Sequence, residues 1–375
     1  MMLHRQIFFW LGILAILVLA LYVLSDVLLP FVAGLGVAYV VDPLVRRLHR
    51  LGINRLAASL LILGVVGVIF IATLTLIAPV LLNQLGAFVE RLPDYVNHLR
   101  SLAAAGGKGL LGAQGHEILK KLGLDAAITS DDVQKTIDYF VGQGTQWLTT
   151  FVRSLWFGGA VLIGILSLIV VTPVVAFYIL LDWDGMIRTL DSWVPPAHQE
   201  TIRHIMHDMD AALAGFVRGQ LLVCLCLGLW YALGLSLIGL DFGFLIGIAG
   251  GLLSFIPYVG SLTALVFSSG VALVQGWPHG TLLFMALAVV LSGQFLEANV
   301  LTPRLVGASI GLHPVWLMLA LFAFGDLFGF TGLMVAVPVA AAIGVLARYA
   351  LRSYLASAYY LEGAGRLPVS GARAE

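Results

Sequence analysis

Charged side chains are rare in the C-terminal half of this chain, and those that occur stand in or beside long apolar runs. Between residues 215 and 347 the charged residues are Arg218, Asp241, Glu297, Arg304 and Asp326. A carboxylate at membrane depth is costly unless it is paired or protonated, so such acids often bind protons or cations. We expect Glu297 and Asp326 to couple transport to protons or ions, with Arg218 and Arg304 as candidate ion-pair partners. Asp241 is expected to cap a helix at the outer surface.

Structural alternatives compete with these roles. Glu297 and Arg304 stand seven residues apart and share a helix face, so an interfacial ion pair is the alternative for both. Arg218 lies near the start of its apolar run and can extend its charge to the membrane surface. Asp326 is expected to stand in the glycine-rich break itself, at depth.

Two apolar segments are interrupted by glycine and proline, and these breaks must position the acids. The first break is the sequence IPYVG at residues 256–260, which includes Pro257, Tyr258 and Gly260. The limb before it, residues 241–255, would span only about 22 Å of a hydrocarbon core that is about 30 Å thick. We therefore expect a re-entrant hairpin, with its second limb starting near Leu262.

The second interrupted segment follows the same plan. Its first limb starts at Pro314, and Gly325, Gly329 and Gly332 break the chain around Asp326. Counting spans gives the two broken segments opposite orientations, the first opening from outside and the second from inside. That arrangement is typical of inverted repeats, whose half-helix ends meet near the membrane midplane and bind substrate. The alternative is two tight helical hairpins that only pack.

Composition sets the class of protein. The chain is 60% hydrophobic and 11% charged, with a mean hydropathy of +1.01, whereas about a quarter of residues are charged in an average soluble domain. We predict an all-α, multi-pass membrane protein with about eight membrane helices or hairpins, set in the lipid bilayer. A net charge of zero gives no basic excess for nucleic acid. Cys224 and Cys226 are expected to be helix fillers on different faces.

The order of spans divides the chain into five regions. They are residues 1–82, three spans with a basic cytoplasmic loop; 83–155, an extracellular or periplasmic helical insert; 156–214, a fourth span and a cytoplasmic amphipathic helix; 215–347, the transport core; and 348–375, a cytoplasmic tail. Residues 7–24 are interpreted as a retained span rather than a signal peptide. The basic loop at residues 42–55 places the N-terminus in the cytoplasm, and Arg348 and Arg352 place the C-terminus there too.

Three further features have a functional and a structural interpretation. The insert, with a capping box at residues 129–132, is either a gate or assembly surface or a packed cap that only stabilises the fold. Pro173 is expected to kink the fourth span, and this kink either lines a pathway or only shapes the helix. The histidines and aspartates of residues 198–210 suggest a metal site, but the interleaved apolar residues favour an ordinary amphipathic helix, so we expect no metal.

Four motifs together resemble the AI-2E family of prokaryotic transporters. They are GLDFGFLIGIAGGLLSFIPYVGSL from Gly239, GFVRGQ from Gly215, QFLEANVLTPRLVGASIGLHP from Gln294 and GFTGLMVAVPVAA from Gly329. The resemblance implies export of the signal autoinducer-2 in some members and antiport of sodium or related cations in others. It also implies a proton-coupled, homo-oligomeric inner-membrane protein. By motif match it adds Asn299 and Pro303 to the candidate pathway residues.

Three functions follow as hypotheses. The first is a secondary transporter that exports a small polar signal or metabolite such as autoinducer-2, with Glu297 or Asp326 taking up and releasing a proton. The second is an antiporter of Na⁺, K⁺ or Li⁺ against H⁺, in which the acids bind the ion directly. The third is a membrane scaffold without transport. No nucleophile constellation or phosphate-binding loop occurs, so neither an enzyme nor a cofactor is expected.

Overall fold

The computed structural model describes residues 19–104, 159–277, 280–306 and 313–357, together with isolated positions at 12, 13, 16, 142, 143 and 360. Within these ranges every regular element is a helix, and six helices are long and apolar enough to cross a membrane. The predicted all-α, multi-pass membrane fold is confirmed. The span expected at residues 7–24 is described only in part, at positions 12, 13, 16 and 19–24, and the insert beyond residue 104, with its capping box, lies outside the described residues except at positions 142 and 143.

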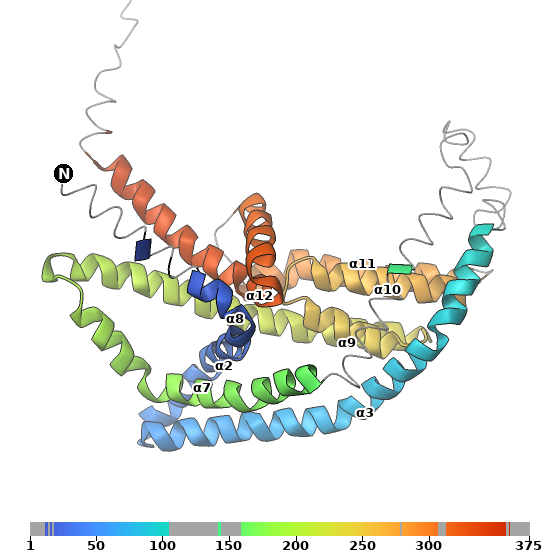
Figure 1. The fold of residues 1–375 in the computed structure, drawn as a ribbon, viewed down its shortest axis with the longest axis horizontal. Coiled ribbons are helices and arrows are strands. Elements are labelled where there is room, and N and C mark those ends of the chain that lie inside the picture. The colour runs from blue at the N-terminus through green and yellow to red at the C-terminus, as the bar shows by residue number, and fades with distance from the viewer. Residues whose placement is uncertain are drawn as a thin grey trace, which may run out of the picture. The chain divides into compact units, whose positions relative to one another are not determined.

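The helices follow one another in the order drawn in Figure 1. They are α2 (Ser25–Arg50), α3 (Arg55–Ala104), α7 (Gly159–Ser192), the 3-10 turn η1 (Pro196–His198), α8 (Gln199–Leu237), α9 (Gly243–Leu253), α10 (Val259–Gln275), α11 (Thr281–Leu296), the π-helix η2 (Glu297–Val306) and α12 (Pro314–Leu355). The apolar helices α9 and α10 are shorter than a membrane span. They correspond to the two short limbs expected around Pro257.

Several helices are longer than the sequence divisions suggested. α3 has 50 residues, or about 75 Å at the rise of an α-helix, so the expected boundary between span and insert at residue 82 is not a helix end. α8 has 39 residues and joins the expected cytoplasmic helix to the next span without a break. Apolar composition marks where a helix can cross a membrane, but polar residues can continue the same helix beyond it.

The basic loop expected at residues 42–55 is mostly helix. Arg47 and Arg50 lie in the last turn of α2, and Arg46 donates to Asp42 one turn earlier at 2.7 Å. Only residues 51–54 connect α2 to α3. The positive charges therefore stand at a helix C-terminus, where the helix dipole favours them.

The chain forms two compact units. The first unit comprises residues 1–64, 168–222 and 300–375, and the second comprises residues 65–167 and 223–299. The helices α3, α7 and α8 therefore each contribute residues to both units. The first broken segment, α9 and α10, belongs to the second unit, and the second broken segment, α12, belongs to the first.

In the first unit α2 packs closely on α7. A Cβ added at Gly34 would lie 2.8 Å from the side chain of Val175, so only glycine allows this approach. One turn away, the Thr172 hydroxyl donates to the carbonyl of Pro30 at 3.4 Å. Pro173 lies within α7, and Asp182 is the residue of this helix with non-helical dihedrals (φ −123°, ψ 22°); the kink expected at Pro173 stays a prediction.

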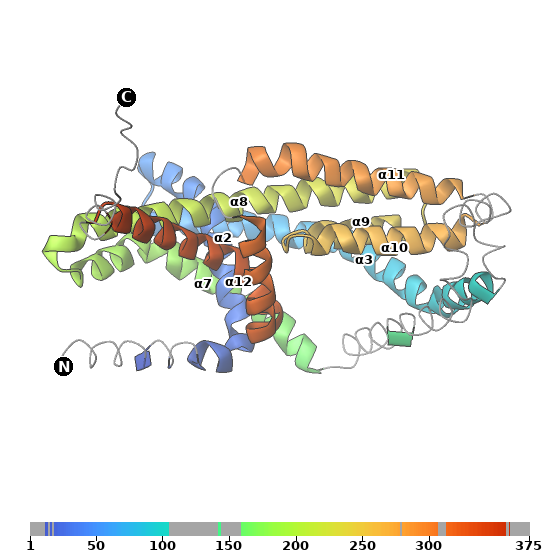
Figure 2. The same ribbon diagram turned by 90° about the horizontal axis from the view of Figure 1, so that it is seen from above.

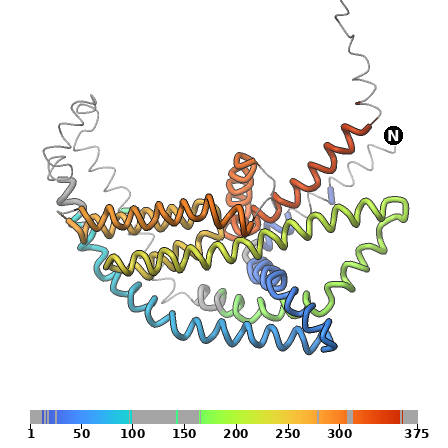
Figure 3. Tube along the Cα trace, turned by 180° about the vertical axis from the view of Figure 1, so that it is seen from behind, coloured from blue at the N-terminus to red at the C-terminus, as the bar shows by residue number. Residues whose placement is uncertain are grey.

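α12 also belongs to the first unit and bends at one residue. Pro314 starts it as expected, and the His313 ring accepts a hydrogen bond from the amide of Val315 at 3.3 Å. The helix then continues through Asp326 and bends at Gly329 (φ 58°, ψ −138°), a conformation that favours glycine. The two limbs diverge from this bend in Figure 3. The expected three-glycine break is therefore a single bend.

In the second unit the latter half of α8 lies beside α9, α10 and α11, as Figures 1 and 2 show. Glycines four residues apart on α9 bring it against the α8 backbone. A Cβ at Gly247 would lie 2.1 Å from the amide nitrogen of Ala232, and one at Gly251 would lie 2.1 Å from the Cα of Gly228. Small residues at this spacing are a common way for membrane helices to approach closely.

Candidate functional site

Glu297 stands where α11 changes into a π-helix. The 16 residues of α11 carry no charge, and Glu297 is the first residue of η2. Its side chain is half-buried. π-helical turns are rare and occur frequently at functional sites, because the wider turn redirects side chains and loosens the backbone hydrogen-bond pattern. The structure thus places an acid of the second unit at an irregular point in an apolar helix.

Two side chains of α8 are within electrostatic range of Glu297. Glu297 interacts electrostatically with Tyr231 and with Cys224, which are seven residues apart and share one face of α8. The ring of Tyr231 lies over Gly293, where an added Cβ would come within 2.2 Å of a ring carbon. Because Glu297 follows Gly293 by one helical turn, both face α8. We call Tyr231, Gly293 and Glu297 the tyrosine–glutamate cluster.

The turn between α9 and α10 also lies in the second unit. Tyr258 has φ 69°, an uncommon value for a residue other than glycine, and its side chain is exposed. Gly260 is buried, and an added Cβ would lie 2.2 Å from the Ser254 hydroxyl. Pro257 is half-buried beside them. The expected break is confirmed, and its backbone is strained and tightly packed at once.

The other candidate residues follow the two units. Asn299, in the second unit, is exposed and donates to the carbonyl of Phe295 in the preceding turn at 3.0 Å. Pro303, Arg304 and Asp326 lie in the first unit and are exposed. Asp326 lies in the last turn of the first limb of α12, three residues before the bend, so the expectation that it stands in the break itself is corrected.

The remaining α12 residues show how tightly its bend is made. A Cβ at Gly325 would lie 2.8 Å from the Leu333 side chain, whereas Gly329 itself is open. The structure therefore brings Gly325 and Gly329 together at one bend of the first unit, and Tyr258 and Gly260 together at one turn of the second. A shared site between the two broken segments, and an ion pair of Glu297 with Arg304, stay predictions.

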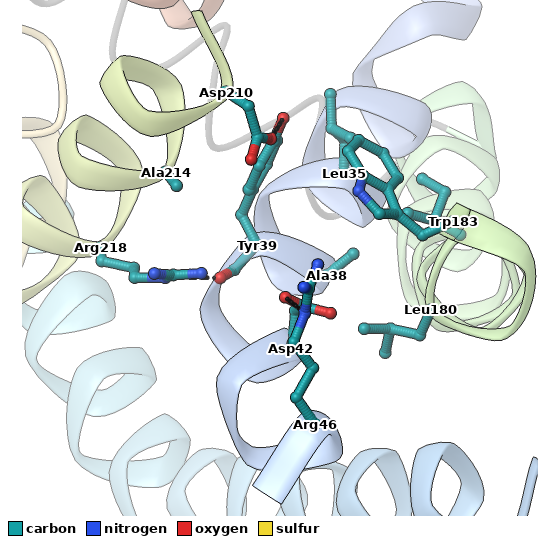
Figure 4. Close-up of a pocket in the computed structure, with 11 residues that line it drawn as sticks. Leu35, Ala38, Tyr39, Asp42, Arg46, Leu180, Trp183, Asp210, Ala214 and Arg218 are labelled. Carbon is teal, nitrogen blue, oxygen red and sulfur yellow. Dashed lines mark hydrogen bonds and ion pairs between the residues drawn. The ribbon is translucent and has the colours of Figure 1, made fainter. Parts of the chain in front are cut away.

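A second polar cluster lies in the first unit and lines a pocket, shown in Figure 4. The Tyr39 hydroxyl donates to Asp210 at 2.9 Å, and the Tyr39 carbonyl accepts from the Arg218 side chain at 2.7 Å. Asp42 and Arg46 line the same pocket. Arg218 thus binds a backbone carbonyl of α2 through its Nε, an arrangement that neither sequence interpretation included.

The expectation that Asp241 caps α9 is wrong. The N-cap of α9 is Phe242, in a left-handed conformation and without a side-chain capping bond. The Asp241 carboxylate instead accepts from Arg91 and Tyr95 of α3, each at 3.2 Å. It therefore ties α3 to the start of α9.

The histidine-rich segment at the start of α8 is an ordinary helix face. His204 pairs with Asp208 one turn on at 3.3 Å. Among the described residues no group of three or more His, Cys, Asp or Glu side chains could hold a metal ion. Cys224 is buried and Cys226 is exposed, and both are free thiols, so they do face different environments.

These features define a multi-pass α-helical membrane protein with broken apolar helices and a half-buried acid. Residues 11–352 match the family described as AI-2E family transporter, and the chain belongs to that family. The resemblance inferred from the motifs is confirmed, and the family assignment indicates a transport protein.

Curated relatives match over most of their length. The chain is 25% identical over 369 residues to "Putative transport protein YrrI" of Bacillus subtilis, covering 92% of this chain and 97% of that protein. It is 27% identical over 330 residues to "Putative permease PerM" of Escherichia coli K12, covering 86% and 87%. It is 22% identical over 336 residues to "AI-2 transport protein TqsA" of Escherichia coli K12, covering 89% of each chain.

Sequence reasoning found the rare acids and missed their neighbours. Tyr231 and Tyr39 stand in apolar runs where an aromatic residue is ordinary, so nothing in composition singles them out. One signal was available: Gly293 and Glu297 are four residues apart, which marks a face where a small residue admits a large partner beside an acid.

Proposed function

We propose that this protein is a secondary active transporter that exports a small polar signal or metabolite, such as autoinducer-2, in exchange for protons. The observation that carries the proposal is Glu297, a half-buried acid at the change from α-helix to π-helix in an apolar segment. An acid in such a place is a functional residue by default. The relative named AI-2 transport protein TqsA supports the class of substrate.

Glu297 takes up a proton from one side of the membrane and releases it to the other. Protonation removes the charge, and with it the energetic barrier to burying the side chain. Solute release and proton uptake then alternate as the two broken segments open in turn. The strained turn before α10 and the bend at Gly329 supply irregular backbone, which is tolerated at depth only if it is buried or lines water.

The protein would lie in a prokaryotic inner membrane with both termini in the cytoplasm. Support comes from the basic end of α2 and from Arg348 and Arg352 near the end of α12, which favour the cytoplasmic side. Residues 83–155 would then lie outside. A homo-oligomer is part of this proposal through the family resemblance.

Transport in everted membrane vesicles tests the proposal. Labelled autoinducer-2 should accumulate under an imposed proton gradient, and Glu297→Gln should abolish accumulation because an amide cannot exchange the proton. Glu90→Gln, an exposed acid on α3, is the matched control and should transport normally. Equal accumulation by Glu297→Gln and the unchanged protein would remove Glu297 from the mechanism.

Cation/proton antiport is the second candidate, because a half-buried carboxylate can bind a cation directly. In proteoliposomes with a preset pH gradient, added Na⁺, K⁺ or Li⁺ should then dissipate the gradient, and Glu297→Gln should prevent this. A gradient unchanged by all three cations would exclude antiport. Accumulation of autoinducer-2 without any cation effect would favour export.

Cysteine labelling tests the two broken segments. In a Cys224→Ala, Cys226→Ala background, cysteines replacing Val259 and Gly329 should react with membrane-impermeant reagents from opposite sides of the membrane. Added solute should change the labelling rate at both. Labelling of both positions from the same side would contradict the opposite orientations.

A further inference from the structure

Tyr231 has a hydroxyl without a hydrogen-bond partner. Its side chain is completely buried, and among the described residues this hydroxyl is one of the few buried polar atoms that lack a partner. Buried polar groups are nearly always satisfied, and an exception calls for an explanation. Tyrosine also brings nothing to helix packing here that phenylalanine lacks, apart from that hydroxyl.

The position of the Tyr231 ring is fixed by Gly293. An added Cβ at Gly293 would lie 2.2 Å from a ring carbon and 2.9 Å from the hydroxyl oxygen, so the ring end and the hydroxyl rest directly on the α11 backbone. Next to them, the Trp230 indole donates to the Val289 carbonyl at 3.3 Å and to the Ser292 hydroxyl at 3.2 Å. α8 and α11 are therefore held in one register around Tyr231 and Gly293.

Glu297 is the acid within electrostatic range of this hydroxyl. It follows Gly293 by one turn, its backbone amide donates to the Gly293 carbonyl, and it interacts electrostatically with Tyr231. Cys224, also on α8, is the second titratable group that interacts electrostatically with it. On α3, Arg91 pairs with Asp241 at 3.2 Å. A buried donor without a partner thus rests on the α11 backbone one helical turn before a half-buried acid.

We propose that Tyr231 is the positioning residue for the proton site of Glu297, donating a hydrogen bond to the Glu297 carboxylate once that group has lost its proton. The inference rests on the proposed role of Glu297 in proton coupling. The tyrosine keeps its own proton throughout. The proton released by Glu297 passes to water in the pathway, and on reprotonation the hydrogen bond is given up.

Physical chemistry explains why a tyrosine suits this role. A hydrogen bond to an ionised carboxylate is among the stronger ones and favours the charged form. The tyrosine hydroxyl can supply this bond without adding a charge, so it lowers the barrier to deprotonation at depth without trapping the acid as an ion pair. The Cys224 thiol is a weak donor and cannot substitute.

Infrared pH titration of the purified protein in lipid tests the proposal without measuring transport. The protonated carboxyl band of Glu297 is identified by its loss in Glu297→Gln. In Tyr231→Phe the midpoint of this band should move up by about one pH unit or more, since one unit corresponds to about 1.4 kcal/mol, close to the value of one hydrogen bond to a charged group. Tyr178→Phe, which removes an exposed hydroxyl of α7, should leave the midpoint unchanged.

The outcomes separate this inference from the proposed function. A shifted midpoint together with absent solute transport would support the hydrogen bond from Tyr231 to Glu297 and contradict the proposed export of a solute. Normal proton-coupled transport with the same midpoint in Tyr231→Phe and the unchanged protein would contradict only the hydrogen bond from Tyr231 to Glu297. If Tyr231→Phe does not fold, 3-fluorotyrosine incorporation gives a stronger donor and should move the midpoint down; an unmoved midpoint would overturn the inference.

Discussion

Tyr39 and Tyr231 are both tyrosines on apolar helices, but the two units treat their hydroxyls differently. In the first unit Tyr39 donates to Asp210 at 2.9 Å, and its carbonyl accepts from Arg218 at 2.7 Å. In the second unit Tyr231 is wholly buried, its hydroxyl has no hydrogen-bond partner, and it interacts electrostatically with Glu297. The first arrangement joins α2 to α8 and is already satisfied. In the second arrangement the Tyr231 hydroxyl is free to donate a hydrogen bond when Glu297 loses its proton.

The largest loss of stability should come from a substitution that fills the space next to the Tyr231 ring. Gly293→Ala puts a Cβ 2.2 Å from the ring, and overpacking of this kind costs about 1–3 kcal/mol. Gly270→Ala on α10 is the control, because its site is open and alanine should favour the helix by up to ~1 kcal/mol. Free energies of unfolding in mixed micelles measure both. Equal stabilities would show that the ring moves aside freely.

Removing the satisfied hydroxyl should have the next largest effect. Tyr39→Phe leaves Asp210 without its donor, and loss of a hydrogen bond to a charged, partly solvated group should cost about 1–2 kcal/mol. Tyr178→Phe is exposed and should change stability little. The same mixed-micelle unfolding measurement applies. A Tyr39→Phe variant as stable as the unchanged protein would mean that the hydrogen-bonded hydroxyl of Tyr39 contributes no more to stability than the unpartnered hydroxyl of Tyr231.

Arg218 contributes a smaller part of the same joint. Arg218→Met keeps most of the apolar stem but loses the bond to the Tyr39 carbonyl, so a loss of about 1 kcal/mol is expected. Because both bonds hold α2 to α8, the double variant with Tyr39→Phe should be less destabilised than the sum of the single variants. Strict additivity would mean that the two bonds act independently.

The sequence predicted the features that depend on rare residues. Prolines and glycines interrupt helices for local reasons, so the turn between α9 and α10 and the start of α12 at Pro314 were predictable. The family followed from whole motifs. Glu297 was found because an acid in an apolar run is uncommon.

What depends on packing was not predictable. Gly325, Gly329 and Gly332 look alike in sequence, yet the bend is at Gly329 alone, because the other two glycines lie against Leu333 and Phe324. Asp241 has the position of a cap, but its partners come from α3, about 150 residues earlier in the chain. The role of Tyr231 depends on which helix lies opposite it, and periodicity does not specify that.

The smallest effect, and the most diagnostic one, should be that of Tyr231→Phe on stability. The variant removes a buried hydroxyl that makes no hydrogen bond in the folded protein, so it should be neutral or stabilising by up to ~1 kcal/mol, in contrast to Tyr39→Phe. The two variants, unfolded side by side in mixed micelles at a pH that keeps Glu297 protonated, give the comparison directly. At a pH where Glu297 is ionised, the Tyr231→Phe variant should be less stable than the unchanged protein, because the Glu297 carboxylate then lacks its donor. A clear loss of stability at both pH values would mean that the Tyr231 hydroxyl makes a permanent structural hydrogen bond, as the Tyr39 hydroxyl does, and does not donate only to ionised Glu297.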